Sequence, residues 1–267
     1  MHCIYLPPFG DDYPYSAKYN TLRKAKSFMQ INFPDDRQDY EHHVEYIRES
    51  FSQYLMLLLQ SNEKIMPIET LKYYLDLGFT KFCVGTIEQA RLIKELAPTA
   101  EIIGSITMKI EPDILYQDLQ TYKKYFDCFV LWFPFNRDLD RINHLPKCFK
   151  YSLLINCGCT IKCDGTHHWF IQESEENAQF YCPKKYNPQE LNKYKNIVLL
   201  RPDHLYLFDK YITYFKLQGR EYPTEKIIQD IVMFTTNFTR YDLFEPYDVK
   251  DIFKFPQPKY YPQTICH

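Results

Sequence analysis

Short, continuous apolar runs alternate with amphipathic segments along most of the chain. Nine of these runs have the length of a β-strand: 3–9, 29–34, 54–60, 81–86, 101–108, 128–135, 151–156, 196–202 and 211–217. Amphipathic segments with helical spacing follow several of them, at 67–78, 87–98, 111–126, 137–144 and 223–238. Runs that are apolar at every position are typical of strands buried on both faces of a parallel sheet.

A repeated strand-then-helix order in a parallel sheet implies right-handed crossover connections. Eight or nine strands in this order favour a closed, TIM-like (β/α)8 barrel over a doubly wound open sheet. We therefore expect an α/β protein with a single barrel domain over residues 1–267, whose first strands are atypical. A C-terminal extension rich in proline and aromatic residues is expected from about residue 239.

Composition limits the classes of protein that the chain can represent. A formal net charge of −2 argues against a chain-wide phosphate-binding surface, although it leaves room for a local basic channel. The apolar run "QYLMLLL" is too short to span a membrane, and the first ten residues lack the features of a secretory signal. Nine cysteines, an odd number, indicate reduced thiols or metal ligands instead of a disulfide framework, so we expect a cytoplasmic protein.

Cysteines gather directly after the predicted strand 151–156, in the stretch "INCGCTIKCDGTHHWF". The strand ends at Asn156, and the candidate metal ligands that follow it are Cys157, Cys159, Cys163 and Cys182. In a barrel, the carboxyl ends of the strands and the loops after them line the face that holds the chemistry. A loop of about forty residues at that face is unusual without a function.

Three kinds of chemistry compete for these sulfur atoms. Cys159, Cys163 and Cys182, with one further ligand, suit an iron–sulfur cluster, because a long loop can wrap around it. Structural zinc is favoured less, since it prefers CxxC pairs and this stretch offers CxC and CxxxC. The radical-SAM motif CxxxCxxC fails because position 166 is Thr166. Buried free cysteines are the remaining alternative.

The stretch "LLINCGCTIKC…HHWF…C", followed by "IVLLRPDHLYLF" and "YITYFKLQGREYPTEKIIQDIVMF", resembles the collagenase-like peptidase family U32. The residues from Lys216 to Arg220 match the K-[IL]-x-G-R strand of that family. The resemblance extends from about residue 50 to 240 and is most specific over 150–235. It implies a barrel fold and, by analogy with better understood branches, a 4Fe–4S cluster that supports oxygen-independent hydroxylation of RNA bases or of a quinone precursor.

The sequence departs from this pattern at the fourth cluster ligand. Several relatives supply a cysteine just before the K-x-x-G-R strand, whereas "DHLYLFDKY" (203–211) contains none. Cys157 could serve, but two ligands in a CxC pair are strained on one cluster, so it ranks below the other three. Cys83 lies inside a predicted strand and is expected to pack in the core.

Four further residues are candidates for substrate binding. Lys216 and Arg220 come at the end of a predicted strand, where they could bind a phosphate or carboxylate, or Arg220 could pair with a neighbouring acid. Asp11 lies in a turn after the first strand and either contacts substrate or solvates the turn. His167 is a candidate ligand or proton shuttle, or part of a packed loop.

Two main hypotheses of function follow. The first is an iron–sulfur enzyme that modifies a larger substrate, such as an RNA base, a quinone precursor or a peptide. The second is a metal-stabilised accessory subunit whose partner protein performs the chemistry. Proteolysis is a third alternative, although the sequence shows no convincing protease triad.

Overall fold

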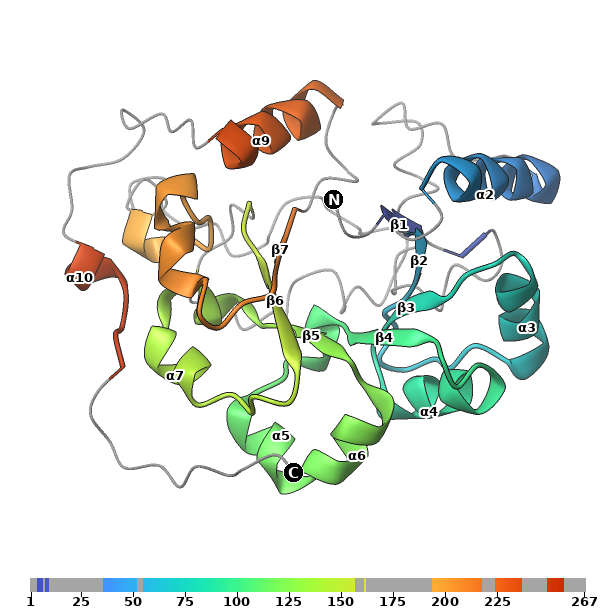
Figure 1. Ribbon diagram of the computed structural model, residues 1–267, viewed down its shortest axis with the longest axis horizontal. Helices are drawn as coiled ribbons and strands as arrows, with labels where there is room; N and C mark the ends of the chain where they lie inside the picture. The colour runs from blue at the N-terminus through green and yellow to red at the C-terminus, as the bar shows by residue number, and fades with distance from the viewer. Residues whose placement is uncertain are drawn as a thin grey trace, which may run out of the picture. The chain divides into compact units, whose positions relative to one another are not determined.

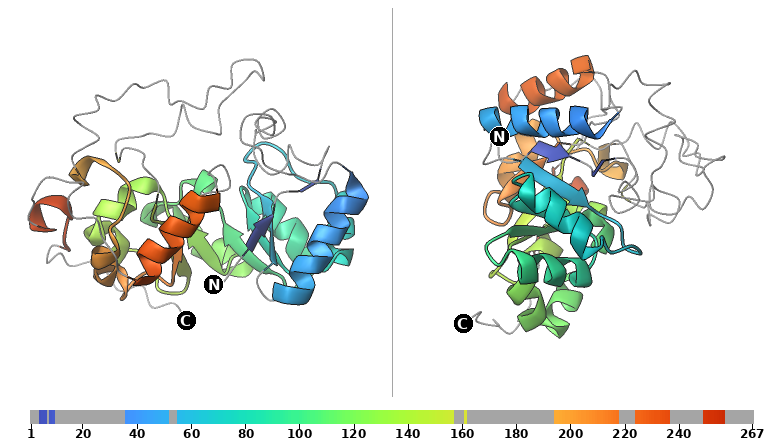
Figure 2. Two further views of the ribbon diagram at one scale, coloured as in Figure 1. Left: turned by 90° about the horizontal axis from the view of Figure 1, so that it is seen from above. Right: turned by 90° about the vertical axis from the view of Figure 1, so that its right-hand side faces the viewer.

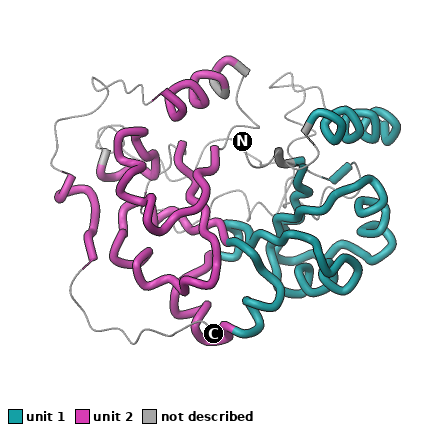
Figure 3. Tube along the Cα trace, viewed as in Figure 1, with its two compact units in different colours: residues 1–108, 120–128, 165–182 teal, residues 109–119, 129–164, 183–267 magenta. Residues whose placement is uncertain are grey.

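A computed structural model describes two compact units of the chain (Figure 3). The described residues are 4–6, 8–9, 36–51, 55–156, 161, 194–217, 224–236 and 249–256. Unit 1 consists of Met1–Met108, Gln120–Cys128 and Gly165–Cys182. Unit 2 consists of Lys109–Leu119, Phe129–Asp164 and Pro183–His267. Each unit is treated by itself below.

The strands of the described residues form a hydrogen-bonded sheet (Figure 1). Its strands are β1 (Ile4–Leu6), β2 (Leu55–Leu59), β3 (Lys81–Val84), β4 (Glu101–Gly104), β5 (Cys128–Val130), β6 (Lys150–Leu154) and β7 (Tyr214–Lys216). They follow one another in chain order, from β1 to β7. The pairs β1–β2, β2–β3, β3–β4 and β6–β7 are parallel. The predicted parallel α/β class is therefore confirmed.

The predicted closed (β/α)8 barrel is wrong. Within the described residues the sheet has seven strands, and β1 and β7 are its two ends instead of paired neighbours. The predicted strand 29–34 lies outside the described residues. The predicted strand 196–202 is described and forms no strand of this sheet.

The run 196–202 is as buried as a strand, but its backbone has other partners. Val198 and Leu200 are fully buried, as the apolar pattern predicts. The carbonyl of Val198 accepts a hydrogen bond from Asn136 Nδ2 at 2.8 Å, and that of Leu199 accepts one from Arg137 Nη2 at 2.7 Å. These two carbonyl groups thus accept hydrogen bonds from side chains instead of from a neighbouring strand. The hydrogen-bonding needs of the buried backbone are met there without strand pairing.

Four helices accompany the strands of unit 1. The helices are α2 (Arg37–Phe51), α3 (Ile68–Asp76), α4 (Ile87–Leu96) and α6 (Leu119–Tyr125), of which α6 starts at the boundary with unit 2. Figures 1 and 2 show α3 and α4 side by side, in agreement with their contacts. Helix α4 begins at Thr86, whose side chain accepts the backbone N–H of Gln89, and this cap fixes the turn out of β3.

The carboxyl ends of β2, β3 and β4 contact one another closely in unit 1. A Cβ atom at Gly85 would lie 2.3 Å from the carbonyl oxygen of Ser61, so only glycine fits after β3. Thr107 Oγ1, in the 3₁₀ turn η3 (Ile106–Met108), donates to the carbonyl of Gln60 at 2.9 Å. At the carboxyl ends of β2 and β3, the sheet edge is therefore packed with atoms of the protein itself.

Unit 2 contains short helices and 3₁₀ turns around β5, β6 and β7. They are α5 (Pro112–Gln117), η4 (Phe133–Arg137), α7 (Leu139–Asn143), η6 (Tyr194–Asn196), η7 (Pro202–Phe208), α9 (Thr224–Thr236) and α10 (Val249–Ile252). The segment after α10 returns to α7, because Lys254 forms a parallel bridge with Asp138. Phe253 beside it is buried against Phe208 and His204.

Among the helices of the described ranges, none is both long and apolar enough to cross a membrane.

Candidate functional site at the carboxyl end of β6

A buried pair of polar side chains marks the carboxyl end of β6. Asn156 comes two residues after the strand and is 6% exposed. Its Nδ2 donates to Oδ2 of Asp230 at 2.8 Å, and Asp230 is 3% exposed. Because a carboxylate is costly to bury without hydrogen-bond donors, this bond ties α9 to the end of β6. Figure 1 shows α9 at that end of the strand.

Helix α9 presents a polar residue on its buried side and apolar residues to solvent. Asp230 is buried, whereas Ile228, Ile231 and Val232 are exposed. An isolated amphipathic helix would have the opposite orientation. The orientation of α9 is therefore consistent with a role for the Asn156–Asp230 bond in docking the helix.

Lys216 lies beside this pair, at the end of the neighbouring strand. It is the last residue of β7 and pairs in register with Leu154 of β6. Its carbonyl accepts the backbone N–H of Ile155 at 3.0 Å, and its side chain is half-buried. The structure thus puts Lys216 at the strand end where the sequence predicted it, while its role in anion binding stays a prediction.

An arginine–aspartate pair lies at the end of the run 196–202 in unit 2. Leu200 N–H donates to the carbonyl of Ile155 at 2.8 Å, which brings Arg201 next to the end of β6. Arg201 makes two parallel hydrogen bonds to Asp203, of 2.9 and 2.7 Å. In this bidentate geometry the guanidinium of Arg201 is bound by a carboxylate of the protein itself.

His204 is the buried imidazole next to this pair. Burial lowers the pKa of His204, and the charges of Arg201 and Arg137 lower it further, whereas Asp203 acts in the opposite direction. We conclude that His204 is neutral near pH 7. A neutral ring is suited to its edge-on contact with Phe253, at 5.3 Å between ring centroids.

Glu111 is a carboxyl group with a raised pKa in the described part of unit 2. Burial is the main cause, and it outweighs the opposing effect of Arg141, with which Glu111 forms an ion pair. Carboxyl groups with raised pKa values are candidates for acid–base chemistry. Glu111 also precedes α5 as its N-cap residue but makes no side-chain cap hydrogen bond, so its ion pair with Arg141 is the structural alternative.

Most of the predicted site residues lie outside the described residues. They are Asp11, Cys157, Cys159, Cys163, His167, Cys182 and Arg220. Their assignments as ligands or substrate contacts therefore stay predictions. In the part of the chain that the structure describes, no group of three or more His, Cys, Asp or Glu side chains could hold a metal.

The described cysteines are free thiols at positions outside the predicted ligand sequence 157–182. They are Cys83, Cys128 and Cys148. Cys83 is fully buried and accepts a hydrogen bond from Gln60 Nε2 at 3.7 Å. Its predicted position in the core is confirmed.

Asp230 is a residue of the site that sequence reasoning missed. It lies 74 residues after its partner Asn156. The available indication was its spacing: Asp230 precedes Met233 and Phe234 by three and four residues, so the three share a face of the helix. An aspartate at such a position is a candidate for a buried polar contact.

Comparison with known proteins bears on the fold. No protein-family model matches the chain, and no curated protein matches it. The parallel sheet with helical crossovers defines an α/β protein, and a search of solved structures finds this arrangement in "The Structure of the U32 Peptidase Mk0906". The similarity has a TM-score of 0.52 at 12% sequence identity, and it covers 83% of this chain and 86% of that chain. The chain therefore has a U32-like fold.

Proposed function

We propose that this protein is an iron–sulfur enzyme of the U32 type that modifies a larger substrate, by hydroxylation of an RNA base, a quinone precursor or a peptide. The observation that supports it best is the position of Asn156. This residue is held on Asp230 at the carboxyl end of β6, and the four-cysteine sequence begins with the next residue. In parallel α/β proteins, ligands bind at the carboxyl ends of the strands.

The proposed ligands are Cys159, Cys163 and Cys182, with Cys157 as the fourth. The donor chemistry fits, because thiolates are the usual ligands of iron–sulfur clusters and the segment is long enough to bring them together. When bound, the cluster would supply one-electron transfer. The Asn156–Asp230 bond would fix the start of this segment, and Lys216 would attract an anionic part of the substrate.

The U32-like fold supports the family assignment that the sequence motifs imply, and it leaves the chemistry open. Peptide hydrolysis is a second candidate, because the similar solved structure is described as a peptidase. A peptide substrate is compatible with both candidates. Hydrolysis of a peptide by the iron-free protein would favour the second.

Single alanine substitutions test the proposed ligands. We expect Cys159→Ala, Cys163→Ala and Cys182→Ala each to abolish cluster retention after anaerobic purification, whereas Cys157→Ala retains part of the iron. Iron and sulfide are measured per protein, together with the visible absorption of the cluster. The three substitutions should leave the far-ultraviolet circular dichroism unchanged.

Two described cysteines provide the control. Cys83→Ala and Cys148→Ala remove thiols that the proposal does not use, so both variants should keep nearly all of the iron. Cys83→Ala leaves a small cavity in the core, which lowers stability without touching the cluster. Iron loss in Cys83→Ala, combined with retention in Cys182→Ala, would mean that the ligand set is wrong.

A further inference from the structure

Two lysines approach one tyrosine ring at the amino ends of β6 and β7. Lys147 lies between α7 and β6, and its Nζ is 5.0 Å from the ring centroid of Tyr211. Lys210 comes just before β7, and its Nζ is 5.4 Å from the same centroid. Because β6 has five residues, about 17 Å of strand separates this place from the carboxyl end of β6.

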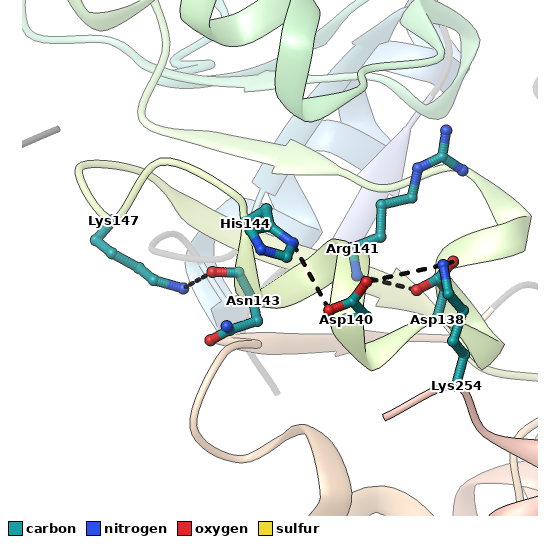
Figure 4. A network of polar contacts seen from close by, with 7 residues as sticks. All are labelled: Asp138, Asp140, Arg141, Asn143, His144, Lys147 and Lys254. Carbon is teal, nitrogen blue, oxygen red and sulfur yellow. Dashed lines mark hydrogen bonds and ion pairs between the residues drawn. The ribbon is translucent and has the colours of Figure 1, made fainter. Parts of the chain in front are cut away.

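The ammonium group of Lys147 is held in position but keeps free donors. It donates one hydrogen bond, of 3.1 Å, to the carbonyl of Asn143 at the end of α7 (Figure 4). An ammonium group has three N–H donors, so two remain for a ligand. This anchoring lowers the entropy cost of arranging the side chain around a bound group.

The acidic residues of α7 are engaged with other cations. Figure 4 shows Asp138 and Asp140 turned toward Lys254, and His144 toward Asp140, while Lys147 lies apart from them. Among the described residues, neither Lys147 nor Lys210 forms an ion pair with a carboxylate.

The two positive charges also repel each other. Partial burial lowers the pKa of Lys147, and the charge of Lys210 lowers it further. A bound anion would relieve this repulsion. Two ammonium groups match the charge of a phosphate group, which is close to −2 near neutral pH, better than the single charge of a carboxylate.

We propose that Lys147, Lys210 and the ring of Tyr211 form a binding site for a phosphate group, at the sheet edge opposite Asn156. Lysine binds phosphate as a point charge, and each of the two ammonium groups lies within 5.4 Å of the centroid of the same aromatic ring. The phosphate is the monoester group of a small molecule, because a backbone phosphodiester of a nucleic acid carries only one negative charge, like a carboxylate. The site is independent of the proposed iron–sulfur chemistry, because it contains none of those residues.

Binding of inorganic phosphate to the full-length protein tests this site. We expect Lys147→Gln and Lys210→Gln each to weaken phosphate binding about tenfold, as measured by equilibrium dialysis. Lys147→Arg, which keeps the charge, should bind within a few-fold of the wild type. Lys64→Gln is the matched control, because it removes the same charge from an exposed lysine of unit 1 and should leave binding unchanged.

Lys210→Gln keeps the test decisive if Lys147→Gln impairs folding, since Lys210 is exposed and donates no hydrogen bond that would be lost. Equal phosphate affinity in the wild type and Lys210→Gln would overturn the proposal, as would an equal loss in Lys64→Gln. Competition by single-stranded RNA as strong as that by a small phosphate monoester, at equal phosphate concentration, would overturn the assignment to a monoester. Phosphate binding without such competition identifies a small phosphate ester.

Discussion

Asn156 and Asp230 connect the end of β6 to α9 through one buried hydrogen bond of 2.8 Å. Removing either partner leaves the other polar group without this contact in a buried environment. We expect Asn156→Ala to lower the free energy of unfolding by about 2 kcal/mol. Asn62→Ala, at an exposed position, is the control and should have little effect.

A double-mutant cycle with Asp230→Ala isolates the pair from other contacts of the two residues. We expect a coupling energy of about 1–2 kcal/mol from denaturant unfolding of the wild type, both single variants and the double variant. A coupling energy near zero would show that the two side chains are adjacent without stabilising each other. In that case the hydrogen bond would not explain the buried position of Asp230.

The sequence predicted the positions of Asn156 and Lys216 because both come at the end of an apolar run. The end of such a run marks the end of a strand, and neighbouring parallel strands end at the same edge. Asp230 could not be placed in this way. Its role depends on how α9 packs against a strand end 74 residues earlier in the chain.

At the scale of elements, hydrophobic patterns identified buried segments better than they identified strands. The runs that became β2, β3, β4 and β6 were predicted within a few residues. The run 196–202 also has a continuous apolar stretch, but Asn136 and Arg137 bind its carbonyl groups from 62 residues away. The hydrophobic pattern of a segment indicates whether the segment is buried. It contains no information about hydrogen-bond partners that are distant in the sequence. The barrel prediction failed in part for this reason.

The contact between η7 and the segment after α10 should depend on pH. His204 packs against Phe253, and burial keeps the pKa of His204 below its ordinary value of 6.5. The unfolded chain therefore binds a proton more readily than the folded protein, and the stabilisation present above pH 6.5 is lost as the pH falls below it. We expect the free energy of unfolding to decrease by up to about 1.4 kcal/mol per pH unit in that range.

Denaturant unfolding at a series of pH values measures this effect. His204→Gln removes the titrating group and should reduce the slope of stability against pH below 6.5. His42→Gln is the control, because His42 is exposed on α2, and it should keep the wild-type slope. An unchanged slope in His204→Gln would assign the acid sensitivity to other groups.

At the scale of the whole molecule, the parallel α/β class was predictable because strand-then-helix order leaves few alternatives. Closure of the sheet was not predictable, since it depends on strand number and on pairing between the two ends. The similarity to a U32 peptidase structure, with a TM-score of 0.52 at 12% identity, is a similarity of fold. That the two compact units fold as a single domain stays a prediction.

The central claim is that the cysteine sequence after Asn156 binds an iron–sulfur cluster. The most direct test is elemental analysis of the full-length wild-type protein, purified without oxygen. We predict a brown preparation that contains about four iron and four sulfide ions per chain. A colourless protein with stoichiometric zinc and no iron would contradict the claim.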